Sequence, residues 1–239
     1  MRKCIVLCFL WGCALSVGAA HAQDAPVPDA QVPQRRELLR TDRFTVYLLD
    51  LAPGQATPMH RHDLDIASVF PTDTRTVGTF WKEPPHPDRP AVGAVRFRAA
   101  GFTHATANTD TSHFLSVIVA FAASQGRPDS MARGRRSDCS QLGPSACTEV
   151  TTLFCLKDVC VLDVTVTPGG VWRATAPVLV VPVTSSVWRT PGSSVASPAR
   201  TLAIGTALYQ PTSGTQWRNE GASAARLIAL QVRLNVPRS

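Results

Sequence analysis

The chain has 239 residues, a formal net charge of +7 at pH 7 and a mean hydropathy close to zero. Its length allows one large β domain or two small ones. After the first 22 residues, no apolar run approaches the length that crosses a bilayer, so we expect no membrane span. The positive charge is scattered except for a short arginine cluster at 133–136. That cluster has no stacking aromatic residues beside it, which argues against nucleic-acid binding.

The first 22 residues are typical of a secretory signal peptide. Arg2 and Lys3 precede the apolar residues 4–19, and the small residues around Ala22 provide a cleavage signal before Gln23. We therefore expect an exported protein, periplasmic or extracellular. Lipidation at Cys13 is the alternative, although the preceding Trp-Gly fits a lipoprotein box poorly.

The next residues, 23–36, are polar and rich in proline, which predicts a disordered leader. The chain then changes to short runs of β-branched and aromatic residues, separated by Gly, Pro, Asn and Asp. This pattern predicts an all-β sandwich or barrel, with no well-capped amphipathic helix. The predicted strands lie within 38–54, 92–101, 113–123, 159–170, 176–188, 201–211 and 225–236.

The two halves of the chain repeat one another. Residues 48–55 resemble 162–170, residues 93–108 match 205–220 in spacing, and residues 114–121 match 226–233. Such self-similarity indicates two copies of one β unit. We expect the first copy at 37–124 and the second at 151–239, joined by a linker at 125–150.

Four of the seven cysteines remain after the signal peptide. Four cysteines permit three pairings, and the sequence does not choose among them. Sequential pairs close short loops, so we expect disulfides between Cys139 and Cys147 and between Cys155 and Cys160. A zinc site is the alternative, but the spacing lacks a C-x-x-C knuckle and the expected compartment is oxidising.

Three histidines in the first half form a candidate metal site. His60 and His62 are separated by one residue, so on a strand both imidazoles project to the same face. Neutral imidazole is a common ligand for transition metals. The pair alone describes two surface histidines equally well, and His104 changes the balance because it arrives within a second motif.

The two segments resemble the two motifs of the cupin superfamily. Gly54, His60 and His62 match the first motif, a Gly followed by five residues and H-x-H. The second motif is a Gly, five residues, P-x-G, two residues, a His, three residues and an Asn. It is matched by Gly93, Gly101, His104 and Asn108, with Ala99 in place of the proline.

The resemblance implies a secreted bicupin-like protein, with two tandem double-stranded β-helix (jelly-roll) barrels. It also implies a divalent metal ion, Fe, Mn, Zn or Ni, bound by the three histidines inside the first barrel. The acidic ligand of the family is missing, since Ile66 or Ala67 takes its place. A β-bulge that turns Asp65 inward would replace it, and this point stays open.

The second copy is expected to be degenerate. Counting from Gly169, the residues that answer to His60 and His62 are Thr175 and Pro177, and in the repeat that starts at Gly205 the residue that answers to His104 is Gln216. These three residues make no metal site. We therefore expect a structural partner barrel or a metal-free pocket. In the first copy, Arg96 and Arg98 would suit an anionic substrate if they faced the interior, but we expect them at the surface.

Two functions follow from these features. The first is an exported metal-dependent enzyme acting on a small organic molecule, a three-histidine oxidoreductase such as a dioxygenase, or an isomerase or lyase. The second is a non-catalytic protein that binds a small molecule or metal and carries a vestigial active site. Catalytic residues, substrate, metal identity and a homodimeric state are left open by the sequence.

Overall fold

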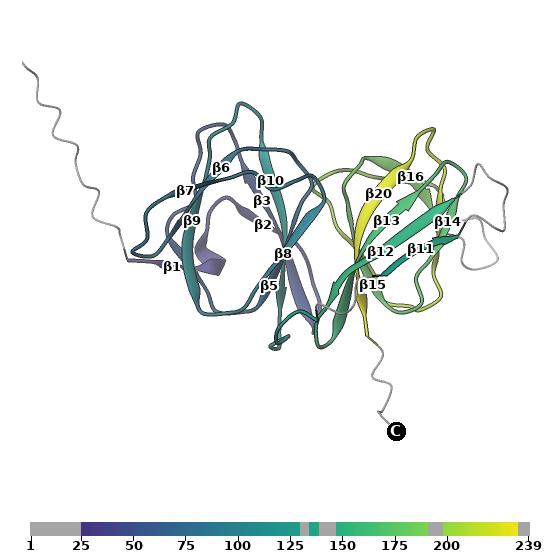
Figure 1. Ribbon diagram of the computed structural model, residues 1–239, viewed down its shortest axis with the longest axis horizontal. Coiled ribbons are helices and arrows are strands. Elements are labelled where there is room, and N and C mark those ends of the chain that lie inside the picture. The colour runs from purple at the N-terminus through teal and green to yellow at the C-terminus, as the bar shows by residue number, and fades with distance from the viewer. Residues whose placement is uncertain (1–24, 130–133, 139–146, 191–197, 234–239) are drawn as a thin grey trace, which may run out of the picture.

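The computed structural model describes residues 25–129, 134–138, 147–190 and 198–233 (Figure 1). The predicted signal peptide, Arg133 and Cys139 lie outside these ranges. Within them, the one helical segment is a single 3-10 turn, η1 (Asp29–Gln31). No described helix is long and apolar enough to cross a membrane.

The first half of the chain forms a barrel of two five-stranded sheets, seen at the left of Figure 1. One sheet has the strand order β1-β4-β9-β6-β7, and the other has the order β2-β3-β10-β5-β8. The bounds are β1 Val27–Pro28, β2 Arg35–Arg40, β3 Phe44–Leu51, β4 His60–His62, β5 Ile66–Phe70, β6 Thr76–Phe80, β7 His86–Asp88, β8 Ala94–Arg98, β9 Phe102–Asn108 and β10 Phe114–Phe121.

The second half forms a similar barrel from a six-stranded sheet, β11-β12-β13-β20-β15-β18, and a four-stranded sheet, β14-β19-β16-β17. The predicted fold class, two jelly-roll barrels in tandem, is confirmed. The bounds are β11 Gly134–Asp138, β12 Thr148–Cys155, β13 Val159–Val166, β14 Val171–Arg173, β15 Val178–Pro182, β16 Ser186–Arg189, β17 Arg200–Leu202, β18 Leu208–Gln210, β19 Gln216–Asn219 and β20 Ala225–Val232.

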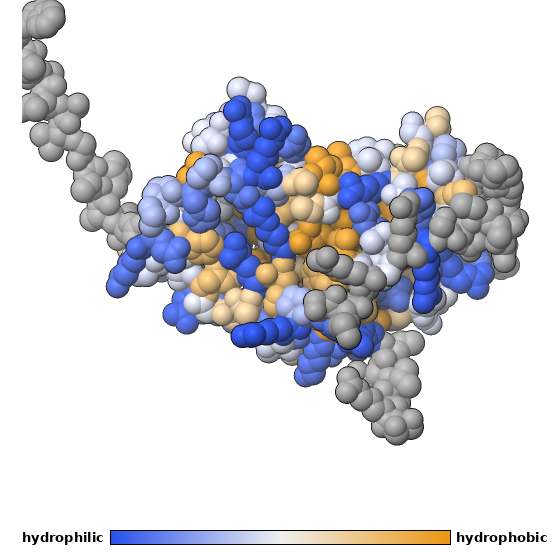
Figure 2. Space-filling model, in the orientation of Figure 1, coloured by the Kyte–Doolittle hydropathy of each residue, from blue (hydrophilic) through white to orange (hydrophobic). Residues whose placement is uncertain are grey.

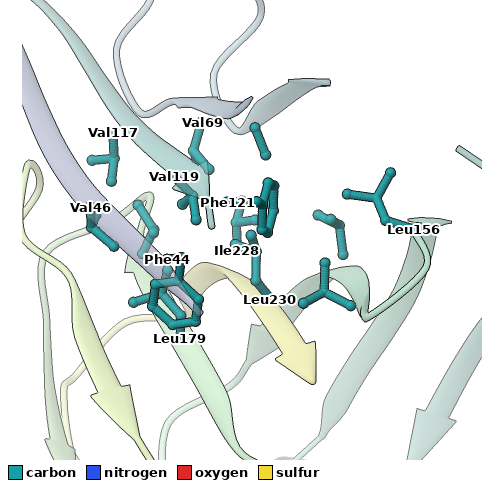
Figure 3. Packing of buried hydrophobic residues seen from close by; sticks show 14 of the residues in the cluster. Phe44, Val46, Val69, Val117, Val119, Phe121, Leu156, Leu179, Ile228 and Leu230 are labelled. Atoms are coloured by element: carbon teal, nitrogen blue, oxygen red, sulfur yellow. The ribbon is translucent and has the colours of Figure 1, made fainter. Parts of the chain in front are cut away.

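Strands β3 and β10 are apolar on both faces because they lie between two cores. On β3, Phe44, Val46 and Leu48 belong to a cluster shared with the second barrel, whereas Leu49 and Leu51 face the interior of the first. Figure 3 shows side chains of both barrels in the shared cluster. Burial on two faces explains why these strands read as continuous apolar runs. On the face shown in Figure 2, apolar surface also gathers where the barrels meet.

Residues 25–36 are not the disordered leader that their composition predicts. Strand β1 pairs in parallel with β4, where Val27 N donates to Met59 O at 2.9 Å. Val32 is buried, and Arg35 begins β2. Composition misled here because two of the polar residues, Asp29 and Arg35, pair with each other inside the barrel. The segment therefore belongs to the first barrel.

The expected linker also contains structure. Strand β11 pairs with β12 along its whole length, which adds an edge strand to the second barrel. Gln125 is buried, and its backbone N–H donates to the carboxylate of Asp65 at 2.7 Å. The arginine cluster lies partly on β11, so it is not simply a loop.

The cysteines confirm one predicted pair. Cys155 and Cys160 face each other across the β12–β13 turn and form a disulfide. Cys147 is also disulfide-bonded, and its predicted partner Cys139 lies outside the described residues. These disulfides contradict the alternative of a four-cysteine zinc site.

Candidate metal centre

Two neighbouring strands of the first barrel bring the three histidines together. On β4, His60 and His62 are buried, while Arg61 between them is exposed, as the alternation of a strand requires. Strand β9 pairs antiparallel with β4 and places His104 directly opposite His60. The three ligand atoms lie within 4.8 Å of one another, the arrangement that the spacing predicts.

The Nε2 atoms converge on one point. His62 Nε2 lies 3.2 Å from His60 Nε2 and 3.1 Å from His104 Nε2. His60 Nδ1 lies 2.9 Å from the carbonyl oxygen of Pro58, and because a carbonyl only accepts, Nδ1 carries the hydrogen. The lone pair of His60 is therefore on Nε2 and points at the other histidines. A carbonyl oxygen that accepts from the ring nitrogen remote from the metal is a common way to orient a metal-binding imidazole.

Burial keeps the three imidazoles neutral. It lowers the pKa of His60 to about 4, an effect to which the nearby Arg35 guanidinium adds. Burial is also the main cause that lowers the pKa values of His62 and His104, and Arg35, Arg98 and the neighbouring imidazoles lower them further. Neutral imidazoles have the free lone pairs that a metal needs.

Aromatic neighbours hold the rings in place. The ring of His62 stacks on Phe102, with 4.4 Å between centroids and 13° between planes. Phe80 stacks against both His104 and His86. The ligand set is thus packed before any metal arrives, which lowers the cost of ordering it.

Asp65 does not replace the missing acidic ligand. Its carboxylate is buried and accepts hydrogen bonds from Ala100 N at 2.8 Å, Gln125 N at 2.7 Å and Ser124 Oγ at 3.2 Å. These bonds anchor two loops, and they explain why this carboxylate is buried. Among the described residues, the one cluster of His, Cys, Asp or Glu side chains that could hold a metal ion consists of the three histidines.

Two further residues, Asp29 and Arg35, lie at this site although no sequence motif points to them. Asp29 Oδ1 lies 3.2 Å from His62 Nδ1 and 3.9 Å from His60 Nε2, and Asp29 forms an ion pair with Arg35. The Arg35 side chain is only 4% exposed, and its Nη2 lies 3.3 Å from both His60 Nε2 and His62 Nε2. The apolar residues that flank them, Val27 and Val32, were the only sequence signal that this segment packs.

A cavity opens in front of the histidines. Its lining includes Arg96, Arg98, Phe80 and His86. The face of β8 that bears both arginines therefore faces the cavity, contrary to expectation, although Arg98 at the end of the strand is exposed as expected. Arg96 forms a two-point ion pair with Asp88. The other cavity residues are Arg35, Leu49, His60, His62, Ile66, Ser68, Phe70, Thr76, Gly78, Asp88, Pro90, His104, Thr106, Phe114, Ser116 and Ile118.

Arg98 differs from Arg96 in that it forms no ion pair with any described residue. Its guanidinium lies 4.8 Å from the centroid of Phe80 and 5.7 Å from that of Phe102, in cation–π contact. Burial lowers its pKa, as does the proximity of Arg96. An arginine has so high a pKa that it stays charged regardless, so Arg98 presents a positive charge to the cavity.

The second barrel has tryptophans where the first has histidines. Gly101 N donates to His62 O, and Gly214 N donates to Ala174 O in the same way. Counted from this turn, Trp172 opposite Trp217 is the counterpart of His60 opposite His104. The expected counterparts Thr175, Pro177 and Gln216 are therefore wrong. The segment from Gly169 to Trp172 is shorter than the one from Gly54 to His60, and the segment from Gly205 to Trp217 is one residue longer than the one from Gly93 to His104. The result, no metal site among these residues, is unchanged.

Solved structures with the same architecture include proteins from several bacteria. AerE from Microcystis aeruginosa matches with a TM-score of 0.59 and 11% identity, over 87% of this chain and 98% of that chain. The oxalate decarboxylase of Lactobacillus farciminis in its formate complex matches with a TM-score of 0.54 and 10% identity, over 82% and 80%. Salicylate 1,2-dioxygenase from Pseudoaminobacter salicylatoxidans, with gentisate, matches with a TM-score of 0.55 and 9% identity, over 87% and 75%.

These matches span both barrels and include cupin-fold proteins. The chain has the bicupin fold. At such identities the likeness shows the fold alone. No family model matches the chain, and no curated protein matches it.

Proposed function

We propose that the first barrel binds one divalent transition metal ion through His60, His62 and His104 and acts on a small organic anion. The observation that carries the proposal is the convergence of three neutral Nε2 atoms at a cavity that also contains an unpaired arginine. The donor set fits a metal, because imidazole suits Fe, Zn and Ni and the tautomer of His60 aims a lone pair at the site. Mn is the fourth candidate that the family resemblance suggests.

When bound, such an ion supplies Lewis-acid or redox chemistry at the positions that three protein ligands leave open. The protein's own residues then decide the substrate. Arg98 is placed to hold a carboxylate or a similar anion, and Phe80 beside it offers an apolar wall. The two enzymes named above, oxalate decarboxylase and salicylate dioxygenase, are named after carboxylates, which agrees with this choice.

The proposed reaction is metal-dependent oxidation of this small acid, or its isomerisation or cleavage. No described side chain stands out as a general base, so the proposed function rests on the three histidines and Arg98. The alternative is a non-catalytic barrel that binds the same anion or the metal. Both functions place the ligand at the same cavity, and turnover separates them.

The test is reconstitution of the purified protein, without its signal peptide, with Fe(II), Mn(II), Zn(II) and Ni(II) in turn. Each form is incubated with a panel of small carboxylic acids and their methyl esters, and oxygen uptake and substrate loss are measured. We expect conversion of at least one acid and not of its ester. The Arg98→Met variant should raise KM for that acid about tenfold or more, because a charge-paired hydrogen bond is lost.

Three outcomes decide between the functions. Acid-specific conversion supports the enzyme. Saturable binding of an acid without conversion supports the non-catalytic alternative. Less than one tenth of an equivalent of each metal after reconstitution contradicts the metal site itself.

We also propose that the protein is exported. The N-terminal pattern ending at Ala22 and the disulfide between Cys155 and Cys160 support this location. Mass spectrometry of the protein recovered from the periplasm or the medium should give a chain that begins at Gln23. A chain retained in the cytoplasm with its N-terminus intact would contradict export.

A further inference from the structure

Arg35 is a buried cation that lies against the proposed metal ligands. Its side chain is almost inaccessible, although guanidinium groups are seldom buried without a purpose or a partner. Asp29 pairs with one end of the guanidinium, through Nη1. The other end, Nη2, lies 3.3 Å from His60 Nε2 and 3.3 Å from His62 Nε2.

The hydrogen-bond roles at this contact are fixed by chemistry. Guanidinium nitrogens only donate, and Nη2 carries two hydrogens. His60 Nε2 must be the acceptor, because the hydrogen of this ring is on Nδ1 and faces Pro58 O. His62 Nε2 must also be an acceptor, because the Arg35 nitrogen beside it only donates, and the hydrogen of this ring is then on Nδ1. Arg35 therefore uses the lone pairs of the two imidazoles that point into the site.

A metal ion needs these same lone pairs. One nitrogen lone pair cannot serve a guanidinium hydrogen and a metal ion at once, and two cations so close together repel each other. From this geometry we infer that Arg35 is a built-in competitor of the metal: it caps His60 and His62 in the metal-free protein and must leave them when the metal binds. The inference deepens the proposed function and rests on it.

The backbone around Arg35 indicates which atoms would move. Arg35 is paired with Leu49 in the β2–β3 ladder, so its main chain is held in the sheet. Arg35 is also one of the residues that line the cavity, and the side chain can withdraw in that direction. Loading would thus require a side-chain rotation and not the opening of the barrel. After that rotation Asp29 would be the nearest carboxylate to the histidines.

The direct test is the affinity for Co(II), followed by visible absorption, with Zn(II) measured by competition. The Arg35→Met variant keeps an unbranched side chain of similar length and removes every donor. We expect it to bind Co(II) about tenfold more tightly or better, since removal of a nearby cation favours a bound dication. Arg35→Lys keeps the charge but cannot bridge both imidazoles, so its affinity should lie between the two.

The matched control is Arg96→Met. Arg96 lines the same cavity, but its ion-pair partner is Asp88. If cavity charge alone set the affinity, Arg96→Met would tighten Co(II) binding as much as Arg35→Met; we expect less than a threefold change. The double variant Asp29→Asn/Arg35→Met removes both buried charges and serves if Arg35→Met does not fold. It should also bind Co(II) more tightly than the wild type.

The outcomes separate this inference from the metal site. If the wild type binds Co(II), and neither Arg35→Met nor the double variant binds it more tightly, Arg35 does not compete and the inference is overturned. If no form binds Co(II) at all, the proposed metal site fails as well. Tighter binding by Arg35→Met with little change in Arg96→Met would establish the competition.

Discussion

The β4–β9 ladder of the first barrel sets His60 opposite His104, whereas the β14–β19 ladder of the second sets Trp172 opposite Trp217. Both pairs face the interior of their barrel: the histidines line a cavity, and the tryptophans belong to the hydrophobic core. In the second barrel, however, the tryptophans pack with Trp188 and with aliphatic residues of the facing sheet. The interior is thereby filled, and the space that is a cavity in the first barrel is hydrophobic core in the second.

The framework around these interiors is the same in both barrels. Asn108 Nδ2 donates to Leu51 O and Ser112 O, and Asn219 Nδ2 donates to Val166 O and Ser223 O. Turn glycines with positive φ, such as Gly54 at 76° and Gly169 at 72°, also recur. Turns and buried amides thus preserve the fold in both barrels, while a few inward-facing side chains decide whether a barrel has a candidate metal site.

The largest expected effect is the loss of metal from the first barrel. His104→Ala removes one of three ligands and should weaken metal binding by more than about 100-fold, because even the loss of an outer-shell partner costs 10- to 100-fold. Isothermal titration with Zn(II) measures it. His113→Ala is the control, since His113 is exposed and pairs with Asp50. Undiminished affinity in His104→Ala would show that His104 is not a metal ligand, and the proposed difference between the two barrels would fail.

The second barrel should respond to the equivalent change in stability instead of metal content. Trp217 is fully buried among the residues of its core. Trp217→Ala should lower the free energy of unfolding by about 3–5 kcal/mol, as other large-to-small changes in cores do. Urea denaturation measures the loss, and the folded variant should still bind one metal ion. A loss below about 1 kcal/mol would mean that this interior is not a packed core.

Much of the fold was predictable because its determinants are local. Alternating or continuous apolar runs predict the strands, and the repeat of Gly54 at Gly169 predicts two barrels. The two-sided burial of β3 was not predictable, because it depends on the second barrel packing against the first. Composition also failed for residues 25–36, since charges that look solvated along the sequence neutralise each other inside the barrel.

The site was predictable in the part that has fixed spacing. His60 and His62 share a face by strand geometry, and His104 follows from the second motif. Asp29 and Arg35 could not be placed, because β1 reaches β4 through a parallel pairing that no short-range pattern encodes. That Arg98 faces the cavity was also not predictable, because the sequence does not show which face of β8 becomes the interior.

A matched pair of amide substitutions tests the shared framework. Asn108→Ala and Asn219→Ala each leave two carbonyl oxygens and one backbone N–H without their partner, at Asp110 in one barrel and at Gly221 in the other. Each should lower the free energy of unfolding by about 2–3 kcal/mol, because buried polar groups lose their hydrogen bonds. Urea denaturation of both variants measures the two losses. If they differ by more than about 1 kcal/mol, the two frameworks are less alike than their hydrogen bonds suggest.

The smallest expected effects concern the turn glycines, and they locate the contact between the barrels. An alanine at Gly54 or Gly169 would meet no atom within 4 Å, so each change should cost only the strain of a positive φ, about 1 kcal/mol. At Gly93, φ is 77° and a Cβ would lie 2.7 Å from Arg226 Nη2.

Arg226 belongs to the second barrel and cannot easily give way. Asp163 holds its guanidinium at two points, and its Nη1 donates to Val92 O of the first barrel. Gly93→Ala should therefore cost about 2–3 kcal/mol, strain and displaced contact together, measured by thermal or urea unfolding. The excess over Gly54→Ala is the part that comes from the contact between barrels. It should vanish in an Arg226→Ala background, and an excess that persists there would place the cost within the first barrel alone.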